Sequence, residues 1–292
     1  MDINSLFGVK VSQASLSCKT PGPRAQSPML PCPPTYPPHP EQGKVVLVTG
    51  GAKGIGRMIS SGFTANGAKV YISSRDAKSC AAAAAELNTA AATKASGGSA
   101  VSLPADLSSA DECSRLASEL AAREPRLHVL VHNSGATWGE DFASFPDAAW
   151  TKLLTLNLQR VFTLTQLLTP LLEAAGGVDP SSSSEPSSPP SRDPARIIHI
   201  GSIDALRVPV MSNFAYSASK AGLHHLSRHL AVELGPRGIT SNTLACGPFP
   251  SKMMAATLRT FGDEITANSP VGRIGSPQDA AGACLFLAGR AG

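Results

Sequence analysis

The sequence predicts an α/β fold, a doubly wound parallel sheet with helices on both faces. Short apolar segments alternate with longer helical stretches along most of the chain. The apolar segments carry Val, Ile and Leu at successive positions, which is typical of strands that are covered on both faces. One domain over residues 43–292 accounts for the whole alternation.

Six strands are expected along this domain, each followed by a helical stretch. They cover residues 44–50, 68–74, 100–106, 127–133, 195–202 and 239–246. The helix after the third strand opens with Ser109 and Glu112, the spacing of a capping box. A further helix is expected over residues 253–265, whose Met and Phe side chains would either cover an apolar substrate or belong to the core.

Two segments are expected to be disordered. Residues 1–42 are rich in proline, which favours extended and solvated backbone. Residues 176–194 read GGVDPSSSSEPSSPPSRDP, a composition that cannot bury enough apolar surface to order itself. The second segment would form a surface insertion between a helix and the fifth strand.

The composition excludes several classes of protein. The 292 residues are 42% hydrophobic and 16% charged, with a net charge of +4 and no basic run, so neither nucleic acid nor a membrane surface is an expected partner. An apolar segment long enough to span a bilayer is lacking, which favours a soluble, cytoplasmic protein. The scattered cysteines and the isolated pair His225 and His229 predict no metal site.

A glycine-rich loop, TGGAKGIG, follows the first strand directly. Gly50 would form the tight turn, Gly54 would let the backbone approach a pyrophosphate, and Gly56 would allow close contact with the next helix. Lys53 and Ile55 lie in the same loop. A strand before such a loop and a helix after it form the context in which it binds a dinucleotide.

The segment FAYSASKAGLHHL places Tyr216 four residues before Lys220, one turn apart on a helix. An ammonium near a phenol favours the phenolate and would lower the pKa of Tyr216 towards neutrality. The spacing alone also fits a surface tyrosine packed on a lysine stem. Ser202, at the end of the fifth strand, could donate a hydrogen bond to a carbonyl oxygen that gains charge during hydride transfer.

These motifs, together with HNSG at residues 132–135 and LTLNL around Asn157, resemble the short-chain dehydrogenase/reductase family over residues 43–289. The resemblance implies a Rossmann fold. It makes Tyr216 the proton donor, Lys220 the residue that lowers its pKa and holds the ribose, Ser202 a hydrogen-bond donor, and Asn157 the holder of a relay water. It also implies a seventh strand that contributes to a homo-oligomer, and the chain ends before it, so we expect a missing edge strand and a weakened oligomer.

The resemblance further implies a set of cofactor contacts: Asn133 and Gly135 on the adenosine side, Asp106 at the adenine, and Gly247 and Ser251 at the carboxamide. NAD enzymes carry an acid after the second strand, where this chain has Ser74 and Arg75. A guanidinium pairs with a 2′-phosphate, and Lys53 adds a second cation, which predicts NADPH. Alternatively, Arg75 is a solvated loop residue and Asp76 is the acid, although Asp76 also suits a helix cap.

Within the family, the sequence is most similar to 3-oxoacyl-carrier-protein reductases, in particular the rhamnolipid-pathway type, through YSASKAGLHHLSRHLAVELGPRGIT. We therefore expect NADPH-dependent reduction of a ketone, with a 3-oxoacyl thioester or a related small-molecule carbonyl as substrate. Two alternatives stay open. One is an NADP-dependent secondary-alcohol or steroid-like dehydrogenase, and the other is a cofactor-binding protein without turnover, because one fold serves many functions.

Overall fold

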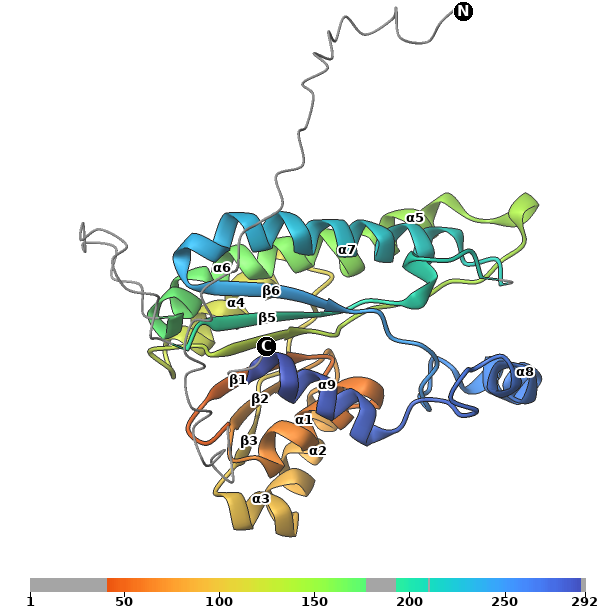
Figure 1. Cartoon of the computed structure of the whole chain (residues 1–292). Coiled ribbons are helices and arrows are strands. Elements are labelled where there is room, and N and C mark those ends of the chain that lie inside the picture. The colour runs from red at the N-terminus through yellow and green to blue at the C-terminus, as the bar shows by residue number, and fades with distance from the viewer. Residues whose placement is uncertain (1–40, 177–192, 210, 290–292) are drawn as a thin grey trace, which may run out of the picture. The chain divides into compact units, whose positions relative to one another are not determined.

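A six-stranded parallel sheet, in the order β3-β2-β1-β4-β5-β6, organises the protein (Figure 1). The computed structural model describes residues 41–176, 193–209 and 211–289. Most of the two segments expected to be disordered, residues 1–40 and 177–192, therefore lies outside the described residues. The sheet confirms the predicted doubly wound class.

Each predicted strand forms, with small differences at the ends. The strands are β1 (Val45–Thr49), β2 (Lys69–Ser73), β3 (Ser99–Ser102), β4 (Val129–His132), β5 (Ala195–Ile200) and β6 (Ile239–Leu244). The largest difference is at β3, which ends at Ser102, although the amides of Leu103 and Ala105 still donate to the carbonyl oxygens of Ile72 at 2.9 Å and Ser74 at 3.1 Å. In the described part of the chain, β6 pairs only with β5 and forms one edge of the sheet.

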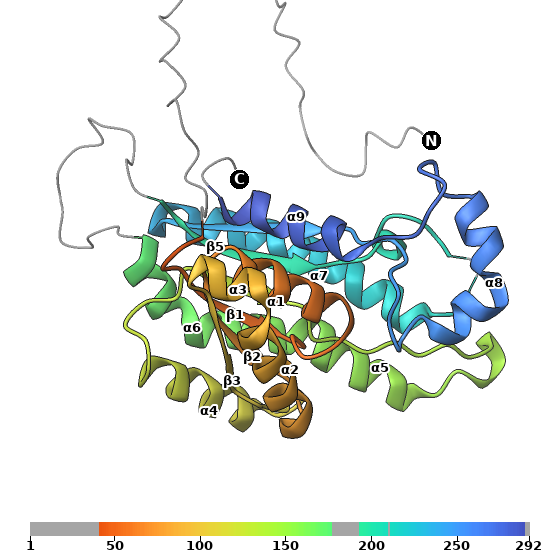
Figure 2. The same ribbon diagram turned by 90° about the horizontal axis from the view of Figure 1, so that it is seen from below.

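Helices cover both faces of the sheet and enclose two hydrophobic cores. Val46 and Val48 of β1 belong to one core, and Val45 and Leu47 belong to the other, as the alternation of side chains along a strand requires. The first core is completed by α1 (Gly54–Ala65), α2 (Ala77–Thr89) and α9 (Pro277–Ala288). The second is completed by α4 (Ala110–Ala121), α6 (Arg160–Gly176) and α7 (Phe214–Leu234). Figures 1 and 2 show these two groups of helices on opposite faces.

In the part of the chain that the structure describes, three further α-helices lie outside these groups: α3 (Ala91–Ser96), α5 (Asp147–Leu154) and α8 (Ala255–Ala267). The predicted helix over residues 253–265 corresponds to α8. None of its residues is buried, and Met253 and Phe261 are each 46% exposed, which excludes the alternative that these two side chains belong to the core. Among the described residues, no helix combines the length and the apolar content that crossing a bilayer requires.

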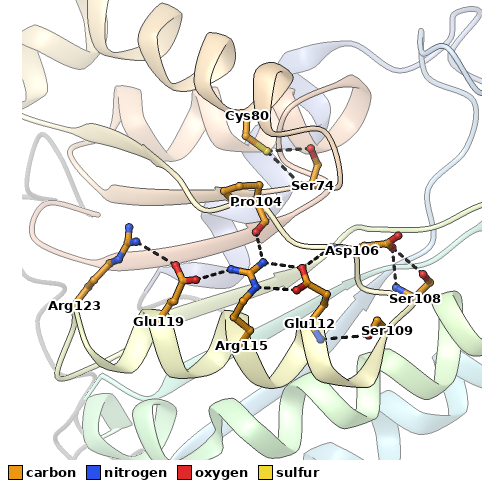
Figure 3. Close-up of polar contacts among 10 residues, drawn as sticks. All are labelled: Ser74, Cys80, Pro104, Asp106, Ser108, Ser109, Glu112, Arg115, Glu119 and Arg123. Carbon is orange, nitrogen blue, oxygen red and sulfur yellow. Dashed lines mark hydrogen bonds and ion pairs between the residues drawn. The ribbon is translucent and has the colours of Figure 1, made fainter.

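The predicted capping box at the start of α4 forms only in part. The Ser109 hydroxyl accepts a hydrogen bond from the Glu112 amide at 3.4 Å, which confirms the cap. The Glu112 carboxylate does not return the bond to Ser109. It accepts from the Arg115 guanidinium at 2.7 and 2.8 Å and from the Asp106 amide at 3.4 Å (Figure 3). Bonds between two charged groups are stronger than the reciprocal cap they replace.

The strand order changes direction between β1 and β4, which are neighbours in the sheet. Strands β2 and β3 extend from β1 on one side, whereas β5 and β6 extend from β4 on the other. In open α/β sheets, ligands bind beyond the carboxyl ends of the strands at such a switch point. All the candidate residues of the cofactor and catalytic sites follow the carboxyl ends of strands or face them from α7 and from the segment between α5 and α6.

Candidate active site

The glycine loop joins β1 to α1 in conformations that need glycine. Gly50 and Gly54 have positive φ angles of 64° and 53°, which residues with a Cβ avoid. A Cβ on Gly56 would lie 2.3 Å from the carbonyl oxygen of Gly50, so α1 can start against β1 only if residue 56 has no side chain. Lys53 occupies the cap position of α1 without capping it through its side chain. The first amides of α1, Ile55 among them, thus form an anion-binding helix terminus.

Asn133 and Thr49 fix the loop after β4 to the glycine loop. The Asn133 side-chain amide donates to the carbonyl oxygens of Thr49 at 3.0 Å and Gly50 at 3.3 Å. The Thr49 hydroxyl accepts from the backbone amides of Asn133 at 2.9 Å and Ser134 at 3.0 Å. Sequence reasoning selected Asn133 but assigned no role to Thr49, whose only signal is its place as the first residue of the segment TGGAKGIG.

Ser74 and Asp106, predicted near the ribose and the adenine, lie beyond the ends of β2 and β3 (Figure 3). The Ser74 hydroxyl lies 3.0 Å from the Cys80 thiol on α2. The Asp106 carboxylate accepts from the Ser108 amide at 3.1 Å and from its hydroxyl at 2.8 Å. Arg75 is exposed and forms no ion pair with any of the described residues.

Lys53 forms an ion pair with Asp76, a contact that the prediction for the 2′-phosphate site did not include. Asp76 caps α2, as expected, because its carboxylate accepts from the amides of Lys78 at 3.1 Å and Ser79 at 3.3 Å. The Ser79 hydroxyl is the main cause that lowers the pKa of Asp76. Lys53, predicted as a second cation for the phosphate, pairs with Asp76 at 3.5 Å. Both side chains are more than half exposed, and exposed pairs are weak, so a phosphate could displace the carboxylate at little cost.

The catalytic candidates meet where α7 crosses the end of β5. The Lys220 ammonium lies 5.9 Å from the centre of the Tyr216 ring and donates to the carbonyl oxygen of Ile200 at 2.7 Å. Lys220 is 5% exposed, and burial lowers its pKa to about 8. Ser202, which is 6% exposed, accepts from the Asp204 amide at 3.1 Å. The structure therefore brings Ser202, Tyr216 and Lys220 together.

The pKa of Tyr216 differs from the prediction. Burial raises it, a hydrogen bond with Ser202 acts in the opposite direction, and the Asp204 carboxylate raises it further. The predicted lowering by Lys220 is thus wrong for the chain without a ligand, because loss of hydration penalises the phenolate more than its neighbours stabilise it. The phenol therefore stays protonated at neutral pH.

Asn157 lies in a π-helical segment, Thr155–Gln159, between α5 and α6 and is fully buried. Its amide nitrogen donates to the Ala136 carbonyl at 2.9 Å and to the Ser219 hydroxyl at 3.0 Å, and its oxygen accepts from the Ala136 amide at 2.9 Å. Both amide hydrogens are thus used to tie the loop after β4 to α7, and only the oxygen keeps a lone pair for a water. Helical π turns are frequent at functional sites.

Gly135 opens a space between Asn157 and Lys220. A Cβ at residue 135 would lie 3.2 Å from the Asn157 side-chain oxygen and 3.7 Å from the Lys220 ammonium. The two polar groups therefore face the same small volume, which a side chain on residue 135 would fill.

The segment after β6 closes on the glycine loop. A Cβ on Gly54 would lie 3.3 Å from the Cβ of Ser251, whose hydroxyl accepts from the Met254 amide at 3.2 Å. Gly247 has open space around its Cα, with no atom within 4 Å of the position of a Cβ. Burial raises the pKa of the Cys246 thiol to about 11, and the charge of Lys220 acts in the opposite direction.

Comparison with known proteins identifies the family of the chain. Residues 44–260 match the family described as short chain dehydrogenase. The chain belongs to this family. A rhamnolipids biosynthesis 3-oxoacyl-[acyl-carrier-protein] reductase of Pseudomonas aeruginosa is 40% identical over 252 residues, which cover 86% of this chain and 91% of the relative. An acetoacetyl-CoA reductase of Allochromatium vinosum is 31% identical and covers 84% of this chain and 91% of its own length.

The solved structures include a complex of Pseudomonas aeruginosa RhlG with NADP, which superposes with a TM-score of 0.75 at 38% identity. The match covers 88% of this chain and 93% of that one. Membership of the short-chain dehydrogenases confirms the predicted Rossmann fold and the predicted class of enzyme, an oxidoreductase.

Sequence reasoning missed one further residue in contact with the site of this short-chain dehydrogenase. The Ser202 backbone amide donates to the Nε2 atom of His224 at 3.3 Å. Tyr216, Lys220 and His224 follow one another at intervals of four residues, which places them on one face of α7. That spacing was a usable signal, because it continues the series that had already selected the first two residues.

Proposed function

We propose that the chain reduces the keto group of a 3-oxoacyl thioester to a secondary alcohol, with NADPH as hydride donor. The observation that carries the proposal is the convergence of Ser202, Tyr216 and Lys220 beyond the end of β5. It occurs in a chain that is 40% identical to a 3-oxoacyl-carrier-protein reductase. A cytoplasmic location and a homo-oligomer stay predictions.

The residues of the site supply a proton and hold the carbonyl. NADPH, when bound, supplies the hydride that forms the new C–H bond. The Tyr216 hydroxyl gives its proton to the carbonyl oxygen, and the Ser202 hydroxyl donates a hydrogen bond to the same oxygen. Burial keeps Tyr216 protonated, which suits an acid in the direction of reduction. Lys220, with a pKa of about 8, can pass a proton to the phenolate and regain it from solvent.

A relay water would fit beside Lys220. The Asn157 side-chain oxygen keeps one lone pair, and the volume beside Gly135 lies between that oxygen and the Lys220 ammonium. This arrangement supports the role of Asn157 that the family resemblance implies, although its amide hydrogens serve the loop after β4.

Steady-state oxidation of NADPH with acetoacetyl-CoA and longer 3-oxoacyl thioesters tests the proposed function. A panel of simple ketones, and of steroid and secondary alcohols with NADP, separates the alternatives. We expect kcat/KM to be highest for the 3-oxoacyl thioesters. A preference for the alcohols would support the dehydrogenase alternative, and NADPH binding without turnover of any compound would support a binding protein.

Cofactor choice gives a first quantitative prediction. Arg75 is exposed and unpaired among the described residues, and Ser74 cannot repel a 2′-phosphate. NADPH should therefore bind at least about tenfold more tightly than NADH, equivalent to ~1.4 kcal/mol. Arg75→Gln should remove most of this preference by weakening NADPH alone, as titration calorimetry can measure. Lys94→Gln, which changes an exposed cation on α3, is the control, and equal affinity of the wild type for both cofactors would contradict the assignment.

Gly135→Ala should lower turnover by about tenfold, equivalent to ~1.4 kcal/mol in the barrier. The new methyl group would occupy the volume between the Asn157 oxygen and the Lys220 ammonium, where we place the relay water. Gly139→Ala is the matched control, because its Cβ would meet only the Ser212 carbonyl, at 4.0 Å. Rates measured with saturating NADPH should fall in the first variant alone. Unchanged turnover of Gly135→Ala would remove the relay from this position.

A further inference from the structure

The His224 ring packs against the backbone at the end of β5. Its Nε2 atom lies 3.3 Å from the Ser202 amide nitrogen and accepts that hydrogen bond. A Cβ on Gly201 would lie 2.1 Å from the same Nε2 atom, so the ring reaches this backbone only because residue 201 is glycine. The contact therefore depends on two residues that match each other in shape.

The Ser202 amide needs this acceptor because of its place in the sheet. Amides of β5 alternate between the two neighbouring strands: Arg196 donates towards β4 at 2.9 Å, and Gly201 donates towards β6 at 2.8 Å. Ser202, the next residue after Gly201, should face the β4 side, but β4 ends at His132. The imidazole of His224 supplies the acceptor that the strand no longer provides.

We propose that His224 is a positioning residue for Ser202 and acts only as a neutral imidazole. The inference rests on the proposed function, in which the Ser202 hydroxyl holds the substrate carbonyl. An accepting Nε2 atom carries no hydrogen, so the ring hydrogen must lie on Nδ1. A second proton on the ring would remove the acceptor, release the Ser202 amide and loosen the hydroxyl of Ser202.

The groups around His224 favour the neutral ring. Burial lowers the pKa of His224 below its ordinary 6.5, and the cations Lys220 and Arg228 on α7 lower it further. The charges of Lys220 and His224 in turn lower the pKa of His199 on β5, and the Cys246 thiol, which follows β6, acts on the pKa of Lys220. The acceptor is therefore present at neutral pH, and it is lost only when the pH falls below 6.5.

The test compares pH profiles of kcat and KM, with NADPH and acetoacetyl-CoA, for the wild type, His224→Gln and His224→Leu. Gln places an amide oxygen near the position of Nε2 and does not titrate, so this variant should keep most of the kcat at neutral pH and lose the fall in kcat below pH 6.5. Leu offers no acceptor, so kcat should fall by about tenfold at every pH, with little change in KM for NADPH. His225→Gln, on the exposed side of α7, should match the wild type. Thermal melting at each pH checks that the variants stay folded.

A second measurement needs no variant and no turnover. Nitrogen-15 NMR of the wild type should show hydrogen on Nδ1 of His224 at pH 7.5, and the Ser202 amide shift should titrate together with that ring. If the wild type turns over no ketone, the proposed function fails, and this measurement still tests the contact. Hydrogen on Nε2, a Ser202 amide that ignores the titration, or a fall in kcat at acid pH that persists in His224→Gln would overturn the inference.

Discussion

Tyr216→Phe should lower kcat for the 3-oxoacyl substrate by roughly 10²–10⁴-fold, the range for loss of a general acid, while the affinity for NADPH barely changes. The substitution keeps the ring that lies 5.9 Å from the Lys220 ammonium and removes the hydroxyl that we propose as the proton donor. Steady-state kinetics and titration calorimetry with NADPH measure the two quantities.

Tyr71→Phe is the matched control for this prediction. Tyr71 on β2 is buried, at 2% exposure, and its hydroxyl donates to Glu124 at 2.7 Å, away from the candidate site. Its loss should cost stability but leave kcat unchanged. Turnover of Tyr216→Phe close to that of the wild type would show that the Tyr216 hydroxyl has no role in proton transfer, and equal losses in both variants would point to a folding defect.

The fold was predictable because its main determinants are local. Apolar strands that alternate with helices define a parallel sheet, and the order of these elements along the chain is read directly from the sequence. The hydrogen-bond partner of the Glu112 carboxylate was not predictable. This carboxylate can accept from the Ser109 amide or from the Arg115 guanidinium, and the structure has the second. The same guanidinium also donates to the Pro104 carbonyl oxygen at 2.7 Å. That choice depends on how α4 packs beside the end of β3.

The residues of the candidate site were predictable from the sequence, but their pKa values and ion pairs were not. The spacing of Tyr216 and Lys220 places them on one face of a helix, as the structure has them. A spacing carries no information on burial, and burial is what raises the pKa of Tyr216. In the same way, the pairing of Lys53 with Asp76 joins two different loops, and no local pattern specifies it.

Two buried histidines lie side by side beneath the site, His132 on β4 and His199 on β5. Their rings stack with centres 5.3 Å apart and an angle of 8° between the planes. His132 is hydrogen-bonded to the Thr165 hydroxyl at 2.8 Å and His199 to the Ser241 hydroxyl at 3.0 Å. Burial lowers the pKa of His199 to about 3, and burial together with His199 lowers that of His132 well below 6.5.

This pair should make the protein acid-labile. The folded pKa values lie below the ordinary value of 6.5 that applies to the unfolded chain, so the unfolded state binds more protons as the pH falls. The free energy of unfolding should therefore be highest above pH 6.5 and should decrease as the pH drops from 6.5 towards 3. At pH 5, His199 alone should remove ~2 kcal/mol, because each pKa unit corresponds to ~1.4 kcal/mol. His132 acts in the same direction.

His199→Phe tests this expectation with little change in packing. Phe retains a flat ring against His132 and cannot titrate, and Ser241 keeps a second partner in the Ser227 hydroxyl at 3.1 Å. Urea unfolding at pH 7.5 and pH 5.0 should show that the loss of stability between the two pH values is smaller in the variant by ~2 kcal/mol. His225→Phe, on the exposed side of α7, should leave that loss unchanged. An identical pH dependence in the wild type and His199→Phe would mean that acid destabilises the protein through other groups.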